Sequence, residues 1–202
     1  MARILILFAH PALENSRVHK RLIRVIQGME GVTFHDLYET YPDFDIDVET
    51  EKTLMLNHDL IIWQHPFYWY SAPAIIKQWE DLVLEHGWAY GQGGTALTGK
   101  RILNVISCGG SREVYSRTGR NRFTIRELLA PFDQTAFLCH MNYLPPFVVH
   151  GTHRLHIEDI DAYALRYKNV LADLVHERIT PAELAEAEYL NDIESITKPI
   201  QS

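Results

Sequence analysis

The chain has few cysteines that could cross-link its fold and no long apolar segment that could span a membrane. Its 202 residues include only two cysteines, Cys108 and Cys139, whose spacing fits neither a disulfide framework nor a metal site. No stretch approaches the roughly 20 consecutive apolar residues of a membrane-spanning helix. The apolar run at residues 4–9 is too short for a signal peptide and lacks a cleavage site of small residues. We therefore expect a cytoplasmic protein.

Basic residues are also in short supply. The chain has 19 Lys and Arg against 26 Asp and Glu, which gives a formal net charge of -7. This excess of negative charge argues against a broad nucleic-acid-binding surface, so no nucleic-acid partner is expected. Hydrophobic residues make up 47% of the chain, enough to bury a core without a structural metal ion.

Two nucleotide-binding motifs are missing or incomplete. There is no Gly-x-Gly-x-x-Gly, which disfavours a Rossmann fold that binds a nicotinamide cofactor. Residues 94–100 nearly match a nucleotide phosphate loop. However, they precede a predicted strand, and Arg101 stands where Ser or Thr is required.

Metal-binding patterns are equally weak. Residues 43–47 begin like a calcium loop, but Val48 replaces the required glycine. His150, His153 and His156 recur every three residues without a carboxylate at a convincing spacing, so they are interpreted as scattered structural or surface histidines. No metal site is predicted.

Apolar strands and amphipathic helices alternate along most of the chain. Strands are expected at residues 4–9, 32–37, 60–64, 101–107 and 141–150, the last broken by Pro145 and Pro146. Helices are expected at residues 16–27, 49–58, 73–83, 124–132 and 157–175. This order predicts an α/β fold with a five-stranded parallel sheet and helices on both faces. Residues 1–178 would form one domain, and the acidic, Ala-rich residues 179–202 a helical or frayed tail.

Three loops leave the carboxyl ends of these strands, where open parallel sheets bind their ligands. The first, residues 10–17, ends in Ser16 at a predicted helix N-terminus, which suits a phosphate group. Ser16 can donate its hydroxyl there, while His10, Arg17 and His19 can add positive character. The same pattern also fits a simple helix cap that binds no ligand.

The second loop carries four consecutive aromatic residues directly after a buried strand: Phe67, Tyr68, Trp69 and Tyr70. Successive side chains point in opposite directions, so some must be exposed or must cover a flat ligand or a partner chain. An ordinary aromatic cluster, partly core and partly surface, is the alternative.

The third loop begins at Ser107 and continues through Cys108, Gly109 and Gly110. Paired glycines allow a ligand to approach the backbone N–H groups, which can stabilise developing negative charge. A plain turn is the alternative. We expect Cys108 to be a small buried thiol rather than a nucleophile.

Taken together, these segments resemble the flavodoxin-like NAD(P)H:quinone oxidoreductases, and in particular the ancillary proteins of bacterial glutathione-regulated potassium-efflux systems. The resemblance extends from about residue 3 to about residue 175. The segments that carry it are residues 9–17, 41–44, 64–69, 87–100, 108–110 and 144–147.

The resemblance implies a non-covalently bound FMN, or FAD, and NAD(P)H as co-substrate. It also implies a two-electron, ping-pong hydride transfer through the flavin to a quinone-like acceptor. The implied phosphate ligands are His10, Ser16, Arg17, Val18 and His19. The residues implied to pack on the flavin ring are Phe67, Tyr68, Trp69 and Tyr70. Those implied to line its polar edge are Ser107, Cys108, Gly109 and Gly110.

Partners follow from the same resemblance: a homodimer, and the cytosolic part of a membrane potassium-efflux antiporter at the cytoplasmic face of the inner membrane. A regulatory subunit with little or no reductase turnover is the alternative. A one-electron carrier such as flavodoxin fits less well, because the loop with His10 is longer than the Thr- and Gly-rich loops of flavodoxins.

The chain departs from the better-known quinone reductases in one loop. These enzymes place a Tyr and a His after the glycine pair. Tyr115 matches the Tyr by position and is the candidate catalytic residue, able to hydrogen-bond the acceptor oxygen. The His has no counterpart, since Arg120, Asn121 and Arg122 occupy that stretch.

Overall fold

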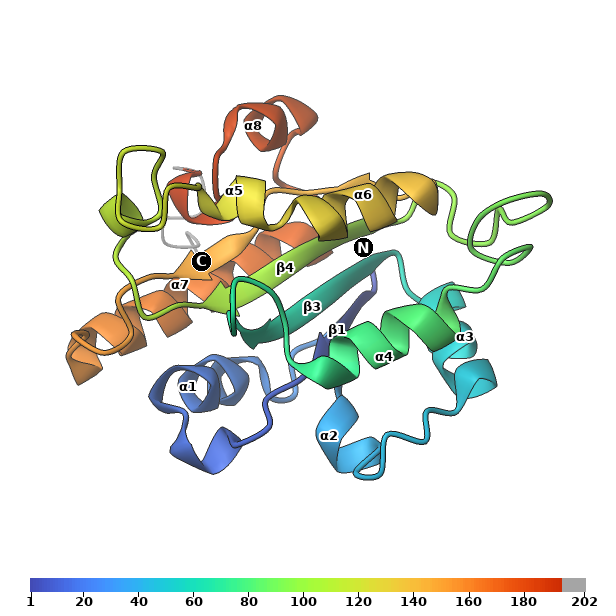
Figure 1. Cartoon of the computed structure of the whole chain (residues 1–202), viewed down its shortest axis with the longest axis horizontal. Helices are drawn as coiled ribbons and strands as arrows, with labels where there is room; N and C mark the ends of the chain where they lie inside the picture. The colour runs from blue at the N-terminus through green and yellow to red at the C-terminus, as the bar shows by residue number, and fades with distance from the viewer. Residues whose placement is uncertain (194–202) are drawn as a thin grey trace.

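The computed structural model describes residues 1–193 and shows a parallel β-sheet between two layers of helices (Figure 1). All the strand pairings are parallel, and the order is β2-β1-β3-β4-β5, with β6 also paired to β4. The predicted α/β fold is therefore confirmed. The strands are β1 (Ile4–Phe8), β2 (Val32–Asp36), β3 (Leu60–Pro66), β4 (Arg101–Ser107), β5 (Asn142–Tyr143) and β6 (Phe147–Val149).

Two strands differ from their predicted bounds by more than one residue. The stretch expected as one fifth strand forms two short strands along β4, because Pro145 and Pro146 between them have no N–H to give to the sheet. The third strand runs two residues past Gln64, to Pro66. Its partner β4 is equally long, and the register pairs His65 with Ile106 and Pro66 with Ser107.

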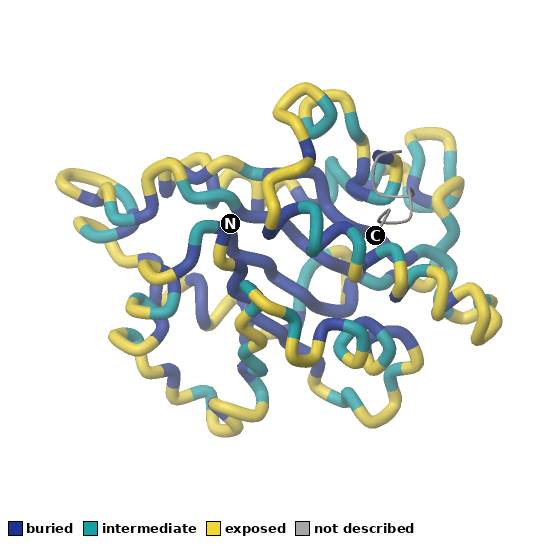
Figure 2. Tube along the Cα trace, turned by 180° about the vertical axis from the view of Figure 1, so that it is seen from behind, coloured by how far each residue is buried: buried dark blue, intermediate teal, exposed yellow. Residues whose placement is uncertain are grey.

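Helices cover both faces of the sheet. On one face lie α1 (Arg17–Ile26) and α7 (Ile157–Val175). On the other lie α2 (Leu37–Thr40), α3 (Val48–Leu56), α4 (Ala74–Val83), α5 (Ile125–Leu128) and α6 (Ala130–Leu138). Along β1, Leu5 and Leu7 pack toward α4, whereas Ile4 and Ile6 pack toward α1, so the strand is buried on both sides (Figure 2). Among residues 1–193, no helix has the length and apolar character needed to cross a membrane.

The predicted helix at residues 124–132 is two helices, α5 and α6. Thr124 caps α5 through a capping box with Glu127. Pro131 then sits in the first turn of α6, where its missing N–H costs nothing, and α6 continues to Leu138.

The C-terminal segment packs on the sheet. It contains α8 (Pro181–Glu186) and the 3-10 turn η3 (Leu190–Asp192). Two further 3-10 turns lie outside this segment, η1 (Leu13–Asn15) and η2 (Arg112–Val114). Tyr189 and Leu190 are buried, and the Asn191 amide both donates to and accepts from the backbone of Val148. A domain boundary at residue 178 stays a prediction, and residues 194–202 of the predicted tail lie outside the described residues.

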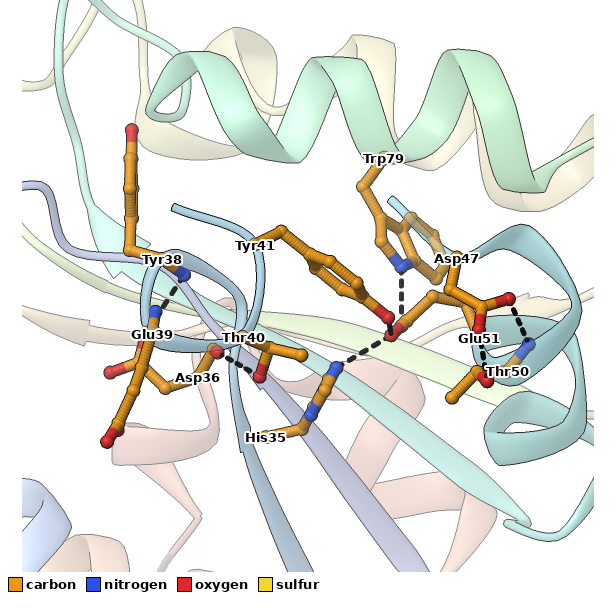
Figure 3. Close-up of polar contacts among 10 residues, drawn as sticks. All are labelled: His35, Asp36, Tyr38, Glu39, Thr40, Tyr41, Asp47, Thr50, Glu51 and Trp79. Atoms are coloured by element: carbon orange, nitrogen blue, oxygen red, sulfur yellow. Dashed lines mark hydrogen bonds and ion pairs between the residues drawn. The ribbon is translucent and has the colours of Figure 1, made fainter. Parts of the chain in front are cut away.

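A buried carboxylate ties the α3–α4 layer to the sheet (Figure 3). Glu51 on α3 accepts hydrogen bonds from His35 Nε2 at 2.7 Å, Tyr41 Oη at 2.7 Å and Trp79 Nε1 at 2.8 Å. Burial alone would raise the pKa of Glu51. The hydrogen bonds from His35, Tyr41 and Trp79 outweigh burial, and the net pKa is lowered. The ionised Glu51 side chain on α3 thus joins three other parts of the chain: β2, the residue just after α2, and α4.

We predict that Glu51→Gln lowers the free energy of unfolding by about 2–4 kcal/mol, because an amide cannot accept all three buried hydrogen bonds. Urea denaturation measures the loss. The matched control is Glu49→Gln on the same helix, where an exposed carboxylate pairs with Lys52 and the expected change is below about 0.5 kcal/mol. Equal losses in the two variants would show that the buried cluster contributes nothing special.

Candidate functional site

Two adjoining cavities open at the carboxyl edge of the sheet. The α1 cavity, of about 350 Å³, lies against the start of α1. The Tyr115 cavity, of about 580 Å³, lies beside Tyr115. Phe67, Gly109 and His153 line both, so the two form one continuous site. The three loops singled out in the sequence therefore meet at a single place, and each cavity falls in the size range of small-molecule sites.

The α1 cavity has the character of an anion site. Ser16 caps α1 by accepting a hydrogen bond from the His19 backbone N–H at 3.0 Å. Ser16, Arg17 and Val18 line the cavity at the start of the helix, where first-turn N–H groups have no partner within the helix. No lining residue carries a carboxylate; they are His10, Ala12, Asn15, Ser16, Arg17, Val18, Pro66, Phe67, Tyr68, Ser107, Gly109, Thr152 and His153.

His19 does not play the charged role expected of it. Its side chain is fully buried, and its Nε2 lies 2.9 Å from Ser107 Oγ. Burial lowers the pKa of His19 well below its ordinary value, and the nearby His10 and His65 add to the effect. The ring is therefore neutral and ties α1 to β4 beneath the cavity. The pKa of His10 is also lowered by burial, which leaves Arg17 as the permanent positive charge at the start of α1.

The aromatic loop divides between the two cavities. Tyr68 lines the α1 cavity, whereas Trp69 and Tyr70 line the Tyr115 cavity. Trp69 and Tyr70 have φ values of 49° and 63°, a left-handed conformation that costs free energy for residues other than glycine. Strain of this kind persists where the surrounding structure imposes it, and it clusters at ligand sites. The Trp69 side chain is 92% exposed, so it lies at the rim.

The glycine loop forms the wall between the two cavities. A Cβ on Gly109 would lie 2.7 Å from the His153 ring, and one on Gly110 would lie 2.9 Å from the Tyr115 ring. A side chain at either position would push the neighbouring ring aside, whereas glycine leaves bare backbone facing the site. Ser107 lines the α1 cavity. The Cys108 side chain reaches neither cavity. Burial raises its pKa to about 12, which fits the expected inert thiol.

Tyr115, the candidate catalytic residue, lines the Tyr115 cavity. Burial raises the pKa of its hydroxyl to about 12, with smaller contributions from the nearby Cys108 and Tyr70. The phenol therefore stays protonated at neutral pH and can donate a hydrogen bond. Arg120 and Asn121 line the same cavity, in the stretch where the resemblance would have placed a histidine.

Sequence reasoning missed a fourth loop, residues 150–154 after β6. It brings His153 and Thr152 to the α1 cavity and His153, Gly151 and Arg154 to the Tyr115 cavity. The signal was present, because this loop also leaves a parallel strand at its carboxyl end. His150 lines neither of these cavities, and its Nδ1 lies 3.4 Å from Cys108 Sγ. Within residues 1–193, no group of three His, Cys, Asp or Glu could hold a metal ion.

Sequence relatives carry names connected with redox chemistry and ion transport. The chain is 46% identical over 169 residues to the uncharacterized NAD(P)H oxidoreductase YrkL of Bacillus subtilis (strain 168), covering 84% of this chain and 97% of the relative. It is 43% identical over 165 residues to the glutathione-regulated potassium-efflux system ancillary protein KefG of Serratia proteamaculans (strain 568), covering 82% and 90%.

Solved structures share both fold and sequence with this chain. General stress protein 14 of Treponema denticola, solved in complex with FMN, matches with a TM-score of 0.80 and 38% identity, covering 87% of this chain and 98% of that one. An NADPH-quinone reductase of P. pentosaceus matches with a TM-score of 0.75 and 35% identity, covering 83% and 96%. The sequence pattern of the family Flavodoxin_2, described as a flavodoxin-like fold, matches residues 2–171. The chain therefore belongs to the flavodoxin-like family Flavodoxin_2, in agreement with the resemblance noted in its sequence.

Proposed function

We propose that this chain is an FMN-dependent NAD(P)H oxidoreductase that reduces a quinone-like acceptor by two electrons in a ping-pong reaction. The observation that carries the proposal is the continuous pair of cavities, one free of carboxylates at a helix N-terminus and one walled by aromatic rings and glycine backbone. The names of YrkL and of the P. pentosaceus reductase support a reductase activity, and the FMN complex of the T. denticola protein supports the cofactor.

The residues present fit a flavin nucleotide. The α1 cavity offers a phosphate group the guanidinium of Arg17, the first turn of α1 and no competing carboxylate. The bare backbone at Gly109 leaves room for a ligand that passes from one cavity into the other. We assign the phosphate to His10, Ser16, Arg17 and Val18, and the ring to Phe67, Tyr68, Trp69, Tyr70, Ser107, Gly109 and Gly110. In this proposal His19 and Cys108 support the site from behind rather than contacting the ligand.

When bound, the flavin supplies the hydride chemistry, and the chain supplies orientation and electrostatics. Backbone N–H groups near Trp69 and at Gly109 and Gly110 would stabilise negative charge that develops at the polar edge of the ring. Tyr115, protonated and beside the cavity, would donate a hydrogen bond to the acceptor oxygen. No side-chain base is needed for the hydride step. A histidine partner for Tyr115 is not part of the proposal.

A second candidate is a regulatory subunit of a potassium-efflux system, which the name of the KefG relative favours. In that case the chain would bind the cytosolic part of a membrane antiporter, as a homodimer at the cytoplasmic face of the membrane. The two roles are compatible, because the same flavin site could serve turnover, sensing or both.

We predict that Arg17→Gln raises the Kd for FMN by about tenfold or more, because a charge-assisted contact to the phosphate is lost. Flavin fluorescence titration measures the Kd. The Kd for riboflavin, which lacks the phosphate, should stay within about twofold. Arg24→Gln, an exposed arginine in the last turn of the same helix, is the control and should leave both affinities unchanged. Equal weakening of FMN and riboflavin by Arg17→Gln would contradict the assignment of the phosphate.

We further predict that Tyr115→Phe lowers quinone-reductase turnover on the order of 100-fold while FMN remains bound, since only the donated hydrogen bond is removed. Stopped-flow kinetics should place the loss in the step that reduces the acceptor. Tyr90→Phe, in the loop between α4 and β4, is the control.

Potassium efflux in cells that carry Tyr115→Phe distinguishes the two candidate functions, because a purely regulatory protein would activate transport normally after turnover is lost. Unchanged acceptor reduction in Tyr115→Phe would remove Tyr115 from the mechanism.

A further inference from the structure

A third cavity, of about 590 Å³, lies between α7 and the C-terminal segment, and the proposed function does not use it. We call it the Arg166 cavity. Its walls come from α7, the end of β6, the loop that holds η2, and residues 189–192. Tyr189, Asn191 and Asp192 lie beyond residue 171, where the family match ends. The matched region alone therefore does not build this cavity.

The carboxylates around the Arg166 cavity already have partners within the chain. The Asp192 carboxylate accepts hydrogen bonds from both terminal nitrogens of Arg112, each at 2.8 Å. The Asp159 carboxylate accepts a hydrogen bond from the His156 backbone N–H at 2.9 Å. A hydrogen bond from Ser111 contributes most to lowering the pKa of Glu113. The negative charges are thus held in place, and Arg112 is neutralised by its acidic partners.

Arg166 is in the opposite situation. Its Nε is shielded from solvent and has no hydrogen-bond partner, and no ion pair engages its guanidinium within the described residues. His150 Nε2, which lines the same cavity, is also buried and has no hydrogen-bond partner among residues 1–193. Burial lowers the pKa of His150 to about 4, so this ring is neutral. Buried polar atoms nearly always have a hydrogen-bond partner, so both atoms favour a ligand in the cavity.

Aromatic and aliphatic side chains make up much of the remaining wall. The Tyr189 ring is buried and held by Arg112, whose guanidinium carbon lies 4.5 Å from the ring centroid. Tyr163, Val148 and Leu155 add further apolar surface. A planar aromatic body fits between such walls, while its charged end meets Arg166.

We propose that the Arg166 cavity binds a small aromatic monocarboxylate. A carboxylate matches the donor geometry of a guanidinium, and the fixed acids nearby favour one negative charge over the two of a phosphate monoester. The His150 ring centroid lies 5.6 Å from that of Tyr189 and 6.1 Å from that of Tyr115, so the ligand would sit behind the Tyr115 cavity. The site does not depend on FMN and stands apart from the proposed reductase activity.

Isothermal titration calorimetry of the purified full chain, with whatever flavin it carries, tests the proposal with three probes. Benzoate is expected to bind at least tenfold more tightly than benzyl alcohol, which lacks the charge, and more tightly than phenyl phosphate. Arg166→Leu is expected to weaken benzoate binding at least tenfold. Arg178→Leu, which removes an exposed arginine paired with Asp173 just after α7, should leave the affinity within twofold.

A second measurement locates the contact. In ¹H–¹⁵N spectra the Arg166 Nε–H signal, assigned by its loss in Arg166→Leu, is expected to shift on addition of benzoate but not of benzyl alcohol. The proposal is overturned if benzoate up to about 10 mM produces neither heat nor a shift of this signal. It is also overturned if phenyl phosphate binds as tightly as benzoate, or if Arg166→Leu, shown by circular dichroism to be folded, binds benzoate like the unaltered chain.

Discussion

Every strand of this sheet runs parallel to its neighbours, and the placement of the whole site depends on that constraint. Parallel strands finish at one edge, so the loops after β1, β3, β4 and β6 all emerge there, although they are far apart in the sequence. Because β3 and β4 are both seven residues long and paired throughout, their loops start at the same level. This is why the aromatic and glycine loops meet and share Phe67 and Gly109 as cavity walls.

Burial then decides which polar groups carry charge. A buried chain of hydrogen bonds runs from the Tyr167 hydroxyl to Gln64, and the neutral ring of His19 joins Gln64 to Ser107. Such groups hold α7, α1 and the sheet together without placing charge beneath the site. Glu51, in contrast, is a buried carboxylate that stays ionised because three hydrogen-bond donors surround it. Arginine, which burial does not readily neutralise, therefore provides the positive charge in the α1 and Arg166 cavities.

The sequence predicted the fold, and it singled out three loops that meet at one edge of the sheet, because both follow from local signals. Buried strands, the cap at Ser16 and the glycine pair are each visible within a few residues. The predictions failed where distant packing decides the outcome. The burial of His19 and the position of His153 between two cavities depend on neighbours more than 40 residues away. The Arg166 cavity was invisible for the same reason, since one of its walls comes from a segment whose composition predicted only a tail.

The late position of that wall has a consequence for how the protein matures. Arg112 and Asp192, which pair across the Arg166 cavity, are 80 residues apart in the chain. At synthesis rates of about 5–20 residues per second, roughly 4–16 s pass between their appearances. Strands β5 and β6 and the loop at residues 150–154 are synthesised within this interval, so every residue that lines the two edge cavities precedes Asp192 in the chain. Of these three cavities, the Arg166 cavity is therefore the last whose wall residues have all been synthesised.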